Sequence, residues 1–320
     1  MNEPVLSIII PCYNCSSYLD VCVLPLVDMD LSYEIILVND GSTDDTEQRL
    51  SKYEKCENIV IVNQENRGVS ATRNVGIDIA KGKYIMFCDS DDYYDSSAIK
   101  KMVTVMQNEE IDCVVTAIRM LTNQETIKYS VASGVFKTGD FLGSIFYQTD
   151  LICISGPWAK LYKRDIILNS NIRFIEDMDL GEDTMFNLAY LKCCKKIAGI
   201  DEISYYYVRQ NENSLYTKFN PKCYEFSKIV CVEMSKLFQI NQIHNVEMYK
   251  HFFYALYGSL IKIAQQKGEV LDKYIDRFLS DSMVLDSVEY LEKTLKNAIL
   301  KKAIQYRWKS VLKYIISMKR

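Results

Sequence analysis

Residues 84–95 read YIMFCDSDDYYD, an apolar run followed at once by four aspartates within seven residues. The run is short and apolar throughout, which predicts a strand buried on both faces of a parallel sheet. The motif Asp89-Ser90-Asp91 then puts two carboxylates at the carboxyl edge of that sheet. Neighbouring carboxylates repel each other unless a cation lies between them, and Mg²⁺ is typically held by one or two carboxylates and the phosphates of a substrate. The stretch therefore predicts a metal-bridged diphosphate site, although D-x-D alone is a weak signal because acidic loops are usually solvated.

Three similar runs precede this strand and alternate with helical patterns. We expect strands at 6–10, 34–38 and 58–62, each short and rich in β-branched residues. Ser42 or Thr43 can cap a helix that runs to about residue 53, and Ser70 can cap one that reaches Ala80 and stops at Gly82. Alternation at this spacing implies right-handed crossovers. The predicted fold class is therefore α/β, with a mostly parallel, Rossmann-like sheet and helices on both faces.

Polar loops follow three of the four strands. Residues 11–14 follow the first strand, residues 39–42 the second, and residues 89–91 the fourth. Ligands of such sheets bind in the crevice at the carboxyl ends of the strands. Because three polar loops meet at this edge, the prediction of a nucleotide-type site becomes much stronger than D-x-D alone would make it.

The pattern changes after about Asp112. We expect strands at 113–118, 126–131 and 203–209, and helices at 140–147 and 181–194. Beyond Pro221 only helical periodicity remains, in segments at about 222–240, 245–266, 270–282 and 285–318. The polar stretch that ends at Pro221 marks a boundary. We therefore predict one α/β domain over residues 1–218 and an all-helical C-terminal region over residues 219–320.

The composition is that of an ordinary soluble globular protein, with 48% apolar and 25% charged residues. A net charge of −4 gives no reason to expect nucleic acid as a partner. No run approaches the roughly 18 apolar residues that cross a bilayer, and the first residues lack the regions of a signal peptide, so we expect a cytoplasmic protein. The eleven cysteines are odd in number and scattered, which indicates reduced, buried thiols. Cys12 and Cys15 have C-x-x-C spacing, but zinc would require a second such pair.

Several motifs stand in a fixed order along the chain: SIIIPCYN (7–14), VNDGSTD (38–44), NRG (66–68) with ATRNVG (71–76), and DSDD (89–92). They resemble the motifs of glycosyltransferase family 2. WAKLY (158–162) and GEDTMF (181–186) resemble the second half of the bacterial polysaccharide-type members, so the resemblance covers about residues 5–215. It implies a GT-A fold and inverting transfer of a sugar from a nucleotide-diphosphate donor, with UDP favoured, to a saccharide acceptor. It also implies Mg²⁺ or Mn²⁺ as cofactor and a role in making a bacterial capsular polysaccharide, exopolysaccharide or lipopolysaccharide.

The resemblance assigns the donor site residue by residue. Tyr13 stacks on the nucleotide base and Asp40 accepts from a uracil N–H, whereas the residues alone make Asp40 equally a turn residue that caps the next helix. Arg73, early in a helix below the same edge, either reaches the donor or pairs with a neighbouring carboxylate. Arg209 either helps to neutralise the diphosphate or is a surface arginine that ends a strand. The predicted nucleotide-sugar site is completed by Pro11, Asn14 and Ser90.

The leaving diphosphate gains negative charge as the glycosidic bond breaks, and a divalent cation stabilises that charge without a proton transfer. By resemblance Asp91 is the direct metal ligand, while Asp89 lies against the ribose or the donor sugar and assists. Asp92 and Asp95 are expected to be solvated or to cap a helix. Many family members add a histidine ligand from a later segment, but the two histidines of this chain fall in the predicted helical region. The third ligand is therefore open.

A carboxylate is the natural general base for the acceptor hydroxyl. Asp183 matches the family's E-D position and lies in the first turn of a predicted helix, where the dipole favours the ionised form. Glu182 is the alternative, because neighbours on a helix diverge by about 100° and only one of them faces the donor. On spacing alone, both are ordinary acidic residues at a helix start. Trp158 forms a wall of the acceptor pocket or belongs to the core, and the sequence does not separate these two interpretations.

Residues 296–320 contain eight Lys and Arg and no acidic residue. One helix over this stretch would carry an apolar stripe formed by Leu300, Ile304, Trp308, Val311, Ile315 and Met318. The opposite side would carry Lys302, Lys309, Lys313 and Arg320. Such a helix lies in the headgroup region of an anionic bilayer, or packs its stripe on the protein. Because similar enzymes often act on lipid-linked saccharides at the inner face of the membrane, peripheral membrane contact through residues 296–320 and a lipid-linked acceptor stay open, as does a homo-oligomer.

Other enzyme classes fit the pattern less well. An oxidoreductase would need G-x-G-x-x-G after the first strand, where residues 11–14 read PCYN. A phosphatase built on D-x-D has the motif after its first strand, and a sugar nucleotidyltransferase has a Gly-rich loop there. One alternative stays open: a non-catalytic subunit that binds a sugar nucleotide or a glycan and has retained the fold.

Overall fold

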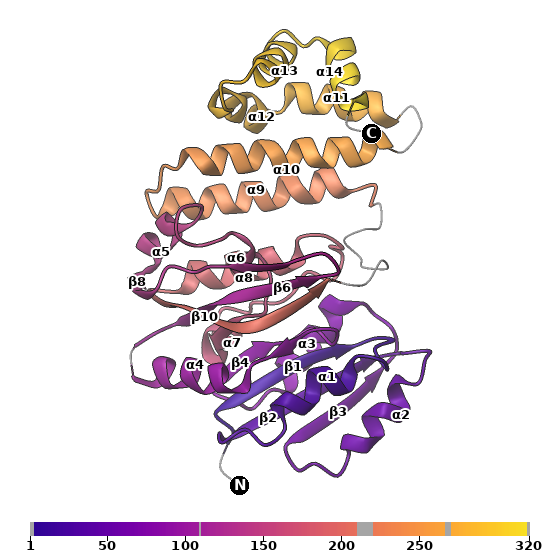
Figure 1. The fold of residues 1–320 in the computed structure, drawn as a ribbon, viewed down its shortest axis with the longest axis vertical. Coiled ribbons are helices and arrows are strands. Elements are labelled where there is room, and N and C mark those ends of the chain that lie inside the picture. The colour runs from indigo at the N-terminus through magenta and orange to yellow at the C-terminus, as the bar shows by residue number, and fades with distance from the viewer. Residues whose placement is uncertain (1–2, 109, 210–219, 266–269, 319–320) are drawn as a thin grey trace. The chain divides into compact units, whose positions relative to one another are not determined.

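The structure is a computed structural model that describes residues 3–108, 110–209, 220–265 and 270–318. The chain divides into two compact units, Met1–Glu212 and Asn213–Arg320. The first unit contains the sheet, and the described part of the second is helical (Figure 1). The predicted boundary after residue 218 lies outside the described residues.

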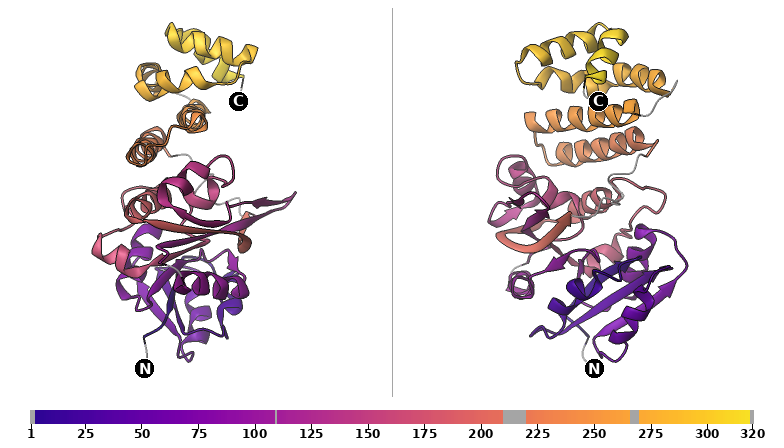
Figure 2. Two further views of the ribbon diagram at one scale, coloured as in Figure 1. Left: turned by 90° about the vertical axis from the view of Figure 1, so that its left-hand side faces the viewer. Right: turned by 45° about the vertical axis from the view of Figure 1, so that its right-hand side comes forward.

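The first half of the sheet is parallel, as predicted. It consists of β1 (Leu6–Cys12), β2 (Tyr33–Asp40), β3 (Ile59–Gln64) and β4 (Tyr84–Phe87), in the order β3-β2-β1-β4. The chain moves outward from β1 to β3 and then returns to β4. Right-handed crossovers therefore place α1 (Leu19–Val23) and α2 (Thr46–Leu50) on one face of the sheet and α3 (Val69–Ile79) on the other (Figure 2). The helix predicted from Ser42 or Thr43 begins later, because the carboxylate of Asp44 accepts from the backbone N–H of Thr46 at 3.0 Å.

Helix α3 lies very close to β1. A Cβ atom at Gly76 would be 2.3 Å from Cγ2 of Ile9, so only glycine permits this approach. Since α3 connects the end of β3 to the start of β4, its first turns lie at the carboxyl edge of the strands. Arg73 is thereby positioned under the predicted site.

The second half of the sheet is mixed. The strands are β5 (Tyr93–Tyr94), β6 (Cys113–Thr122), β7 (Thr126–Tyr129), β8 (Gly134–Lys137), β9 (Lys160–Lys163) and β10 (Lys196–Arg209). The order continues β4-β9-β6-β10-β5, and only β6 and β10 run parallel to each other. β5, β8 and β9 were not predicted, because strands of two to four residues are too short to show a periodicity.

Further helices surround this half of the sheet. They are α4 (Ser96–Asn108), α5 (Thr138–Ser144), α6 (Ile152–Ser155), α7 (Arg164–Asn169) and α8 (Glu182–Cys193). α4 packs against β6, β9 and β10. All eleven cysteines are free thiols, as predicted, and most are buried.

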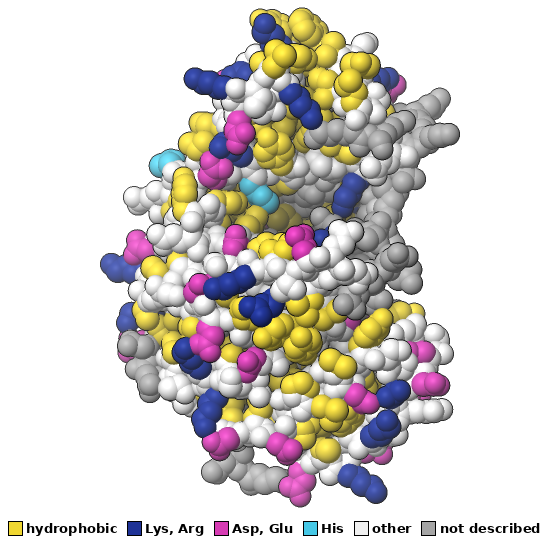
Figure 3. All heavy atoms as spheres, in the orientation of Figure 1, with side chains coloured by type: hydrophobic (Ala, Val, Ile, Leu, Met, Phe, Trp, Pro, Cys, Tyr) yellow, Lys and Arg dark blue, Asp and Glu magenta, His cyan; other side chains and the backbone are white. Residues whose placement is uncertain are grey.

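The second unit contains α9 (Cys223–Ile240), α10 (Val246–Gln265), α11 (Val270–Ser280), α12 (Ser282–Ser287), α13 (Leu295–Gln305) and α14 (Lys309–Ser317). α10 is central and contacts α9, α11, α12 and α14. Both histidines of the chain, coloured cyan in Figure 3, belong to this unit: His244 precedes α10 and His251 lies within it. None of the helices that the structure describes is long and apolar enough to cross a bilayer.

The single helical segment predicted over residues 285–318 is wrong. α13 ends at Gln305, where Arg307 has a left-handed φ of 53° and Trp308 N–H donates to the carbonyl of Ala303 at 2.7 Å. Arg307 N–H donates to Ile304 O at 3.1 Å, which completes a Schellman motif. The predicted apolar stripe is therefore broken. Leu300 and Ile304 are buried in the unit, whereas Trp308 and Met318 are exposed.

Candidate active site

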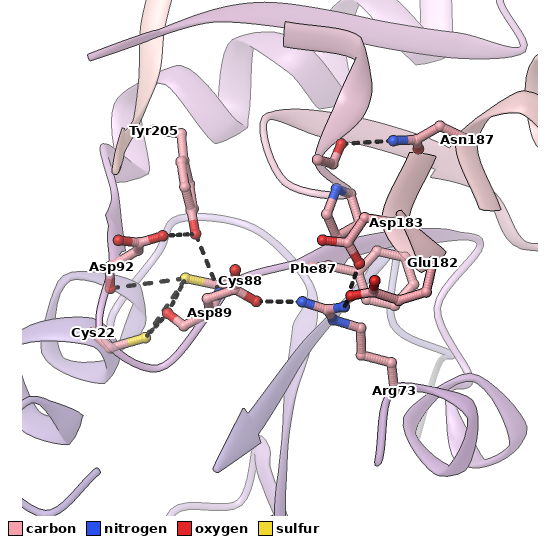
Figure 4. A network of polar contacts seen from close by, with 12 residues as sticks. Cys22, Arg73, Phe87, Cys88, Asp89, Asp92, Glu182, Asp183, Asn187 and Tyr205 are labelled. Atoms are coloured by element: carbon pink, nitrogen blue, oxygen red, sulfur yellow. Dashed lines mark hydrogen bonds and ion pairs between the residues drawn. The ribbon is translucent and has the colours of Figure 1, made fainter. Parts of the chain in front are cut away.

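Arg73, on α3, joins the loop after β4 to the first turn of α8 (Figure 4). Its guanidinium donates to Asp183 Oδ1 at 2.5 Å and to Asp89 Oδ1 at 2.7 Å, and a carboxylate oxygen of Glu182 lies 3.9 Å away. Asp89 comes from the end of β4, and Glu182 and Asp183 come from the first turn of α8. The Arg73 side chain is only 4% exposed. The ion-pair alternative for Arg73 is thus present, and its predicted contact with a donor stays a prediction.

Three carboxylates around one guanidinium leave an excess of negative charge. Burial raises the pKa of Asp183 to about 8, against the lowering effect of Arg73 and with help from Glu182 and Asp89. Burial outweighs the helix dipole, which was expected to favour the ionised form. Burial alone would lower the pKa of Arg73, but the negative charges of Asp183 and Asp89 outweigh this effect. The pKa of Arg73 is therefore raised above its ordinary value, and the guanidinium stays charged. The site therefore contains a carboxyl group whose pKa is close to physiological pH, as a general base requires.

The D-x-D loop is clamped from β10. Asp92 Oδ2 accepts from the Tyr205 hydroxyl at 2.6 Å, and Asp92 Oδ1 accepts from Val208 N–H at 2.7 Å. The same hydroxyl oxygen accepts from Asp89 N–H at 3.2 Å. Asp92 is buried, and burial raises its pKa well above the ordinary value. The expectation that Asp92 is solvated or caps a helix is therefore wrong. For Asp95 it is confirmed, because its carboxylate accepts from Ser97 N–H at 2.9 Å at the start of α4.

Asp40 connects β2 to the start of α3. Its buried carboxylate accepts from Arg67 N–H and Gly68 N–H, both at 2.9 Å, and from Gln64 Nε2 at 2.6 Å. Gly68 has a φ of 88°, a conformation that favours glycine, and α3 begins at the next residue. Asp40 thus holds the turn that leads to Arg73, and does not cap the helix that directly follows β2. Its predicted contact with a uracil N–H stays a prediction.

The loops after β1 and β2 are joined, as their convergence predicted. Asn14 Oδ1 accepts from Thr43 N–H at 2.8 Å, and Ser42 Oγ accepts from Asn14 N–H at 3.0 Å. Asn14 adopts a left-handed φ of 49°, which turns the chain directly after Tyr13. The Tyr13 ring is 51% exposed and is therefore available for stacking on a base. The remaining predicted donor residues are Pro11, within β1, and Ser90, which lies between Asp89 and Asp91 in the loop after β4.

Trp158 and Arg209 lie at the β10 side of the first unit. Trp158 is 6% exposed and stacks on Tyr205 and Tyr207, with ring centroids 5.2 and 5.6 Å away. It is largely a core residue, and its predicted contact with an acceptor stays a prediction. Arg209 is the last residue of β10 and is exposed.

Sequence reasoning missed the residues that hold the Trp158 loop. Lys160 is buried, and its Nζ donates to the carbonyls of Cys153 and Gly156, each at 2.6 Å. Asn187, one turn after Asp183 on α8, donates to the carbonyls of Ser155 and Gly156 at 2.9 and 2.7 Å. The loop and the proposed base are therefore positioned by the same helix. Lys160 lies inside the WAKLY motif and Asn187 directly follows GEDTMF, but neither has a sequence signal for this role, because these partners are backbone carbonyls.

The part of the chain that the structure describes contains no group of three or more His, Cys, Asp or Glu side chains placed to hold a metal. A cation shared with a diphosphate requires fewer protein ligands. Asp91 fits that requirement: it is half-buried beside Asp89, and burial followed by the charge of Asp89 raises its pKa to about 6. Asp89 fits in part, since Arg73 already occupies one of its oxygens. The oxygen donors and the excess negative charge suit Mg²⁺ or Mn²⁺.

Comparisons with known proteins show the family of the chain and its fold. The family model described as Glycosyl transferase family 2 matches residues 7–168, half of the chain. A protein of Bacillus subtilis (strain 168) described as uncharacterized glycosyltransferase EpsJ is 32% identical over 217 residues, which cover 66% of this chain and 63% of that protein. The poly(ribitol-phosphate) beta-glucosyltransferase of Bacillus spizizenii is 32% identical over 211 residues, 63% of this chain but 32% of that protein. The chain thus spans less than two thirds of the length of each of these relatives.

Solved structures are similar over nearly the whole chain. The crystal structure of Staphylococcus aureus TarS 1–349 in complex with UDP-GlcNAc has a TM-score of 0.69 at 20% identity, and the match covers 98% of this chain and 91% of that one. At this identity the likeness shows the fold alone. The fold is GT-A followed by a helical region, as the sequence predicted.

Proposed function

Because the chain belongs to glycosyl transferase family 2, we propose that it transfers a sugar from a nucleotide-diphosphate donor to a saccharide acceptor with inversion at the anomeric carbon. One observation carries the proposal: Arg73 joins the D-x-D residue Asp89 to Asp183. The carboxylate proposed to act on the leaving diphosphate and the proposed base therefore lie in one site. UDP is the proposed nucleotide, supported by the TarS complex with UDP-GlcNAc and by the position of Asp40. The proposed product is a bacterial surface polysaccharide, since one relative is named for poly(ribitol-phosphate).

The residues on the donor side of the site bind the nucleotide and its diphosphate. Tyr13 offers an exposed ring for the base. Asp91 and Asp89 would hold Mg²⁺ or Mn²⁺, which when bound stabilises the negative charge of the departing diphosphate. Arg73 holds Asp89 in place through the 2.7 Å bond and keeps the donor side from being uniformly negative. Arg209 is proposed to add positive charge near the diphosphate.

The residues on the acceptor side of the site remove a proton from the acceptor hydroxyl. The acceptor oxygen attacks the anomeric carbon from the face opposite the diphosphate, and its proton passes to a carboxylate oxygen of Asp183. The bond between the anomeric carbon and the diphosphate oxygen breaks, and its electron pair stays on the diphosphate. Glu182, beside Asp183, raises the pKa of the base and is the alternative base. Trp158, held by its stacking on Tyr205, lines the acceptor side.

A screen of nucleotide sugars tests the proposal. Thermal unfolding should be measured with UDP-, GDP-, dTDP- and CMP-sugars, with and without Mn²⁺. A UDP-sugar at about 100 times its Kd should raise Tm by about 5 °C or more, and the increase should depend on the metal. Asp91→Ala should lose the metal-dependent increase, while Asp95→Ala, which removes the same charge from the same loop, should keep it. If no nucleotide sugar binds, or if binding ignores the metal in every case, the proposal is wrong.

A further inference from the structure

The two units differ strongly in charge. Residues 213–320 contain 18 Lys and Arg against ten Asp and Glu, a net charge of +8, although the whole chain carries −4. The first unit is therefore at −12. An asymmetry of this size between the halves of a chain indicates an anionic partner for the basic half.

The unpaired positive charge of this unit includes three side chains on and after α13. Residues 295–318 contain no acidic residue. Lys301, Lys309 and Lys313 are neutralised by ion pairs with acidic residues of the same unit, namely Glu289, Asp276 and Asp272. Lys296, Lys302 and Arg307 are exposed, and none of them has an ion pair with any described residue. These three cations face solvent.

Large apolar side chains are exposed beside these cations. Leu295 is 81% exposed and Trp308 48%, and Ile299 and Tyr306 are exposed as well. Leu295 and Ile299, at i and i+4, share one side of α13, and Tyr306 directly follows the helix. The Tyr306 and Trp308 rings stack at 5.4 Å. In Figure 3, yellow apolar and dark blue basic side chains lie next to each other at the top of the view, where Figure 1 labels α13 and α14.

We propose that these exposed residues of α13 and of the following turn, here called the α13 patch, bind the headgroup region of an anionic lipid bilayer. The cations are complementary to anionic headgroups, and the aliphatic and aromatic side chains suit the boundary between headgroups and acyl chains. A soluble polyanion would use the charges but would leave Leu295 and Ile299 in water. The patch differs from the stripe expected from the sequence, because Leu300 and Ile304 are buried. The inference does not depend on the reaction at the first unit.

Vesicle co-sedimentation tests the charge requirement. The full chain should sediment with vesicles of phosphatidylcholine containing 30 mol% phosphatidylglycerol, and not with pure phosphatidylcholine. Lys296→Glu with Lys302→Glu should weaken this binding by at least about tenfold. The control pair, Lys236→Glu with Lys273→Glu, makes the same change in net charge on α9 and α11 and should bind as the wild type does. Equal binding to both vesicle types, or equal loss in both variants, would overturn the proposal.

Tryptophan fluorescence tests whether the patch enters the bilayer. The chain has two tryptophans, and only Trp308 is exposed, since Trp158 is 6% exposed. Anionic vesicles should shift the emission to shorter wavelength, and brominated lipids should quench it. Both effects should vanish in Trp308→Phe, which keeps an apolar ring and a folded unit by circular dichroism. If soluble polyphosphate competes fully and the vesicles leave Trp308 emission unchanged, the partner is a polyanion and the membrane proposal is wrong.

Discussion

Arg73 donates to Asp183 at 2.5 Å, although the two residues are 110 positions apart in the chain. The same guanidinium binds Asp89, so the two carboxylates proposed for opposite ends of the reaction share one cation. Movement of either carboxylate is thereby coupled to the other.

Replacing Arg73 by lysine should show this coupling. Lysine keeps the charge but loses the fork that donates to two carboxylates at once. We expect transfer activity to fall by at least about tenfold and stability by about 1–3 kcal/mol. Arg67→Lys is the matched control, since Arg67 pairs with Glu176 at the surface and should change stability by less than about 0.5 kcal/mol. Urea unfolding and steady-state kinetics measure both effects, and equal behaviour of the two variants would refute the coupling.

The activity should depend on the ionisation of Asp183. Because its pKa in the folded protein is about 8, the base is protonated at lower pH, and kcat/KM should rise with pH and level off above about 8. Glu182 raises this pKa, so Glu182→Gln should move the rising limb to lower pH. A profile of kcat/KM against pH for both proteins measures this. A limb that stays in place, or that moves upward, would show that Asp183 is not the titrating group.

The Tyr205 hydroxyl should position the D-x-D loop. Tyr205→Phe removes the O–H that Asp92 accepts, together with an acceptor of Asp89 N–H. We expect a loss of about 1–3 kcal/mol in stability and a larger rise in the donor KM than in the acceptor KM. Tyr206→Phe is the control, because the Tyr206 ring stacks on Tyr93 and no hydrogen bond joins its hydroxyl to another described residue. An equal rise in both KM values for Tyr205→Phe would indicate a general loss of stability instead.

Lys160 should stabilise the loop that carries Trp158 and thereby affect the binding of the acceptor. Its buried Nζ donates to the carbonyls of the loop that carries Trp158, and burial lowers its pKa to about 8. Lys160→Met removes this donor from both carbonyls, although Asn187 still donates to Gly156, and should cost about 1–3 kcal/mol and raise the acceptor KM. Lys163→Met, at the other end of β9, removes a partly buried ion pair with Asp112 and should leave the acceptor KM unchanged. Thermal unfolding and acceptor titrations distinguish the two.

The sequence predicted the elements that local pattern determines. Periodicity, turns and caps predicted the four parallel strands, the convergence of their loops and the helix that begins at Glu182. The structure contains all of these elements. The family motifs led to Asp89, Asp91, Arg73 and Asp183, and the structure brings Asp89, Arg73 and Asp183 together. Their chemical roles stay predictions.

The wrong predictions had two causes: a hydrogen-bond partner far away in the sequence, and an unusual residue in the turn that ends a helix. Asp92 looked like a solvated acid because Tyr205, its hydrogen-bond partner, is 113 positions away. The turn at Arg307 was missed because a Schellman motif usually contains glycine, and here an arginine adopts the left-handed conformation. The stretch beyond it kept its helical period, so the sequence alone predicted one continuous helix.

The central claim is that Asp183 is the base of an inverting sugar transfer, and Asp183→Asn tests it most directly. The amide keeps the shape of the side chain but cannot take the acceptor proton. Donor binding and the transfer rate should be measured on the same protein, once the screen has identified a donor. Donor affinity should stay within about threefold of the wild type, and the transfer rate should fall by at least about 100-fold. Transfer at the wild-type rate would contradict the role of Asp183 and would require a different base.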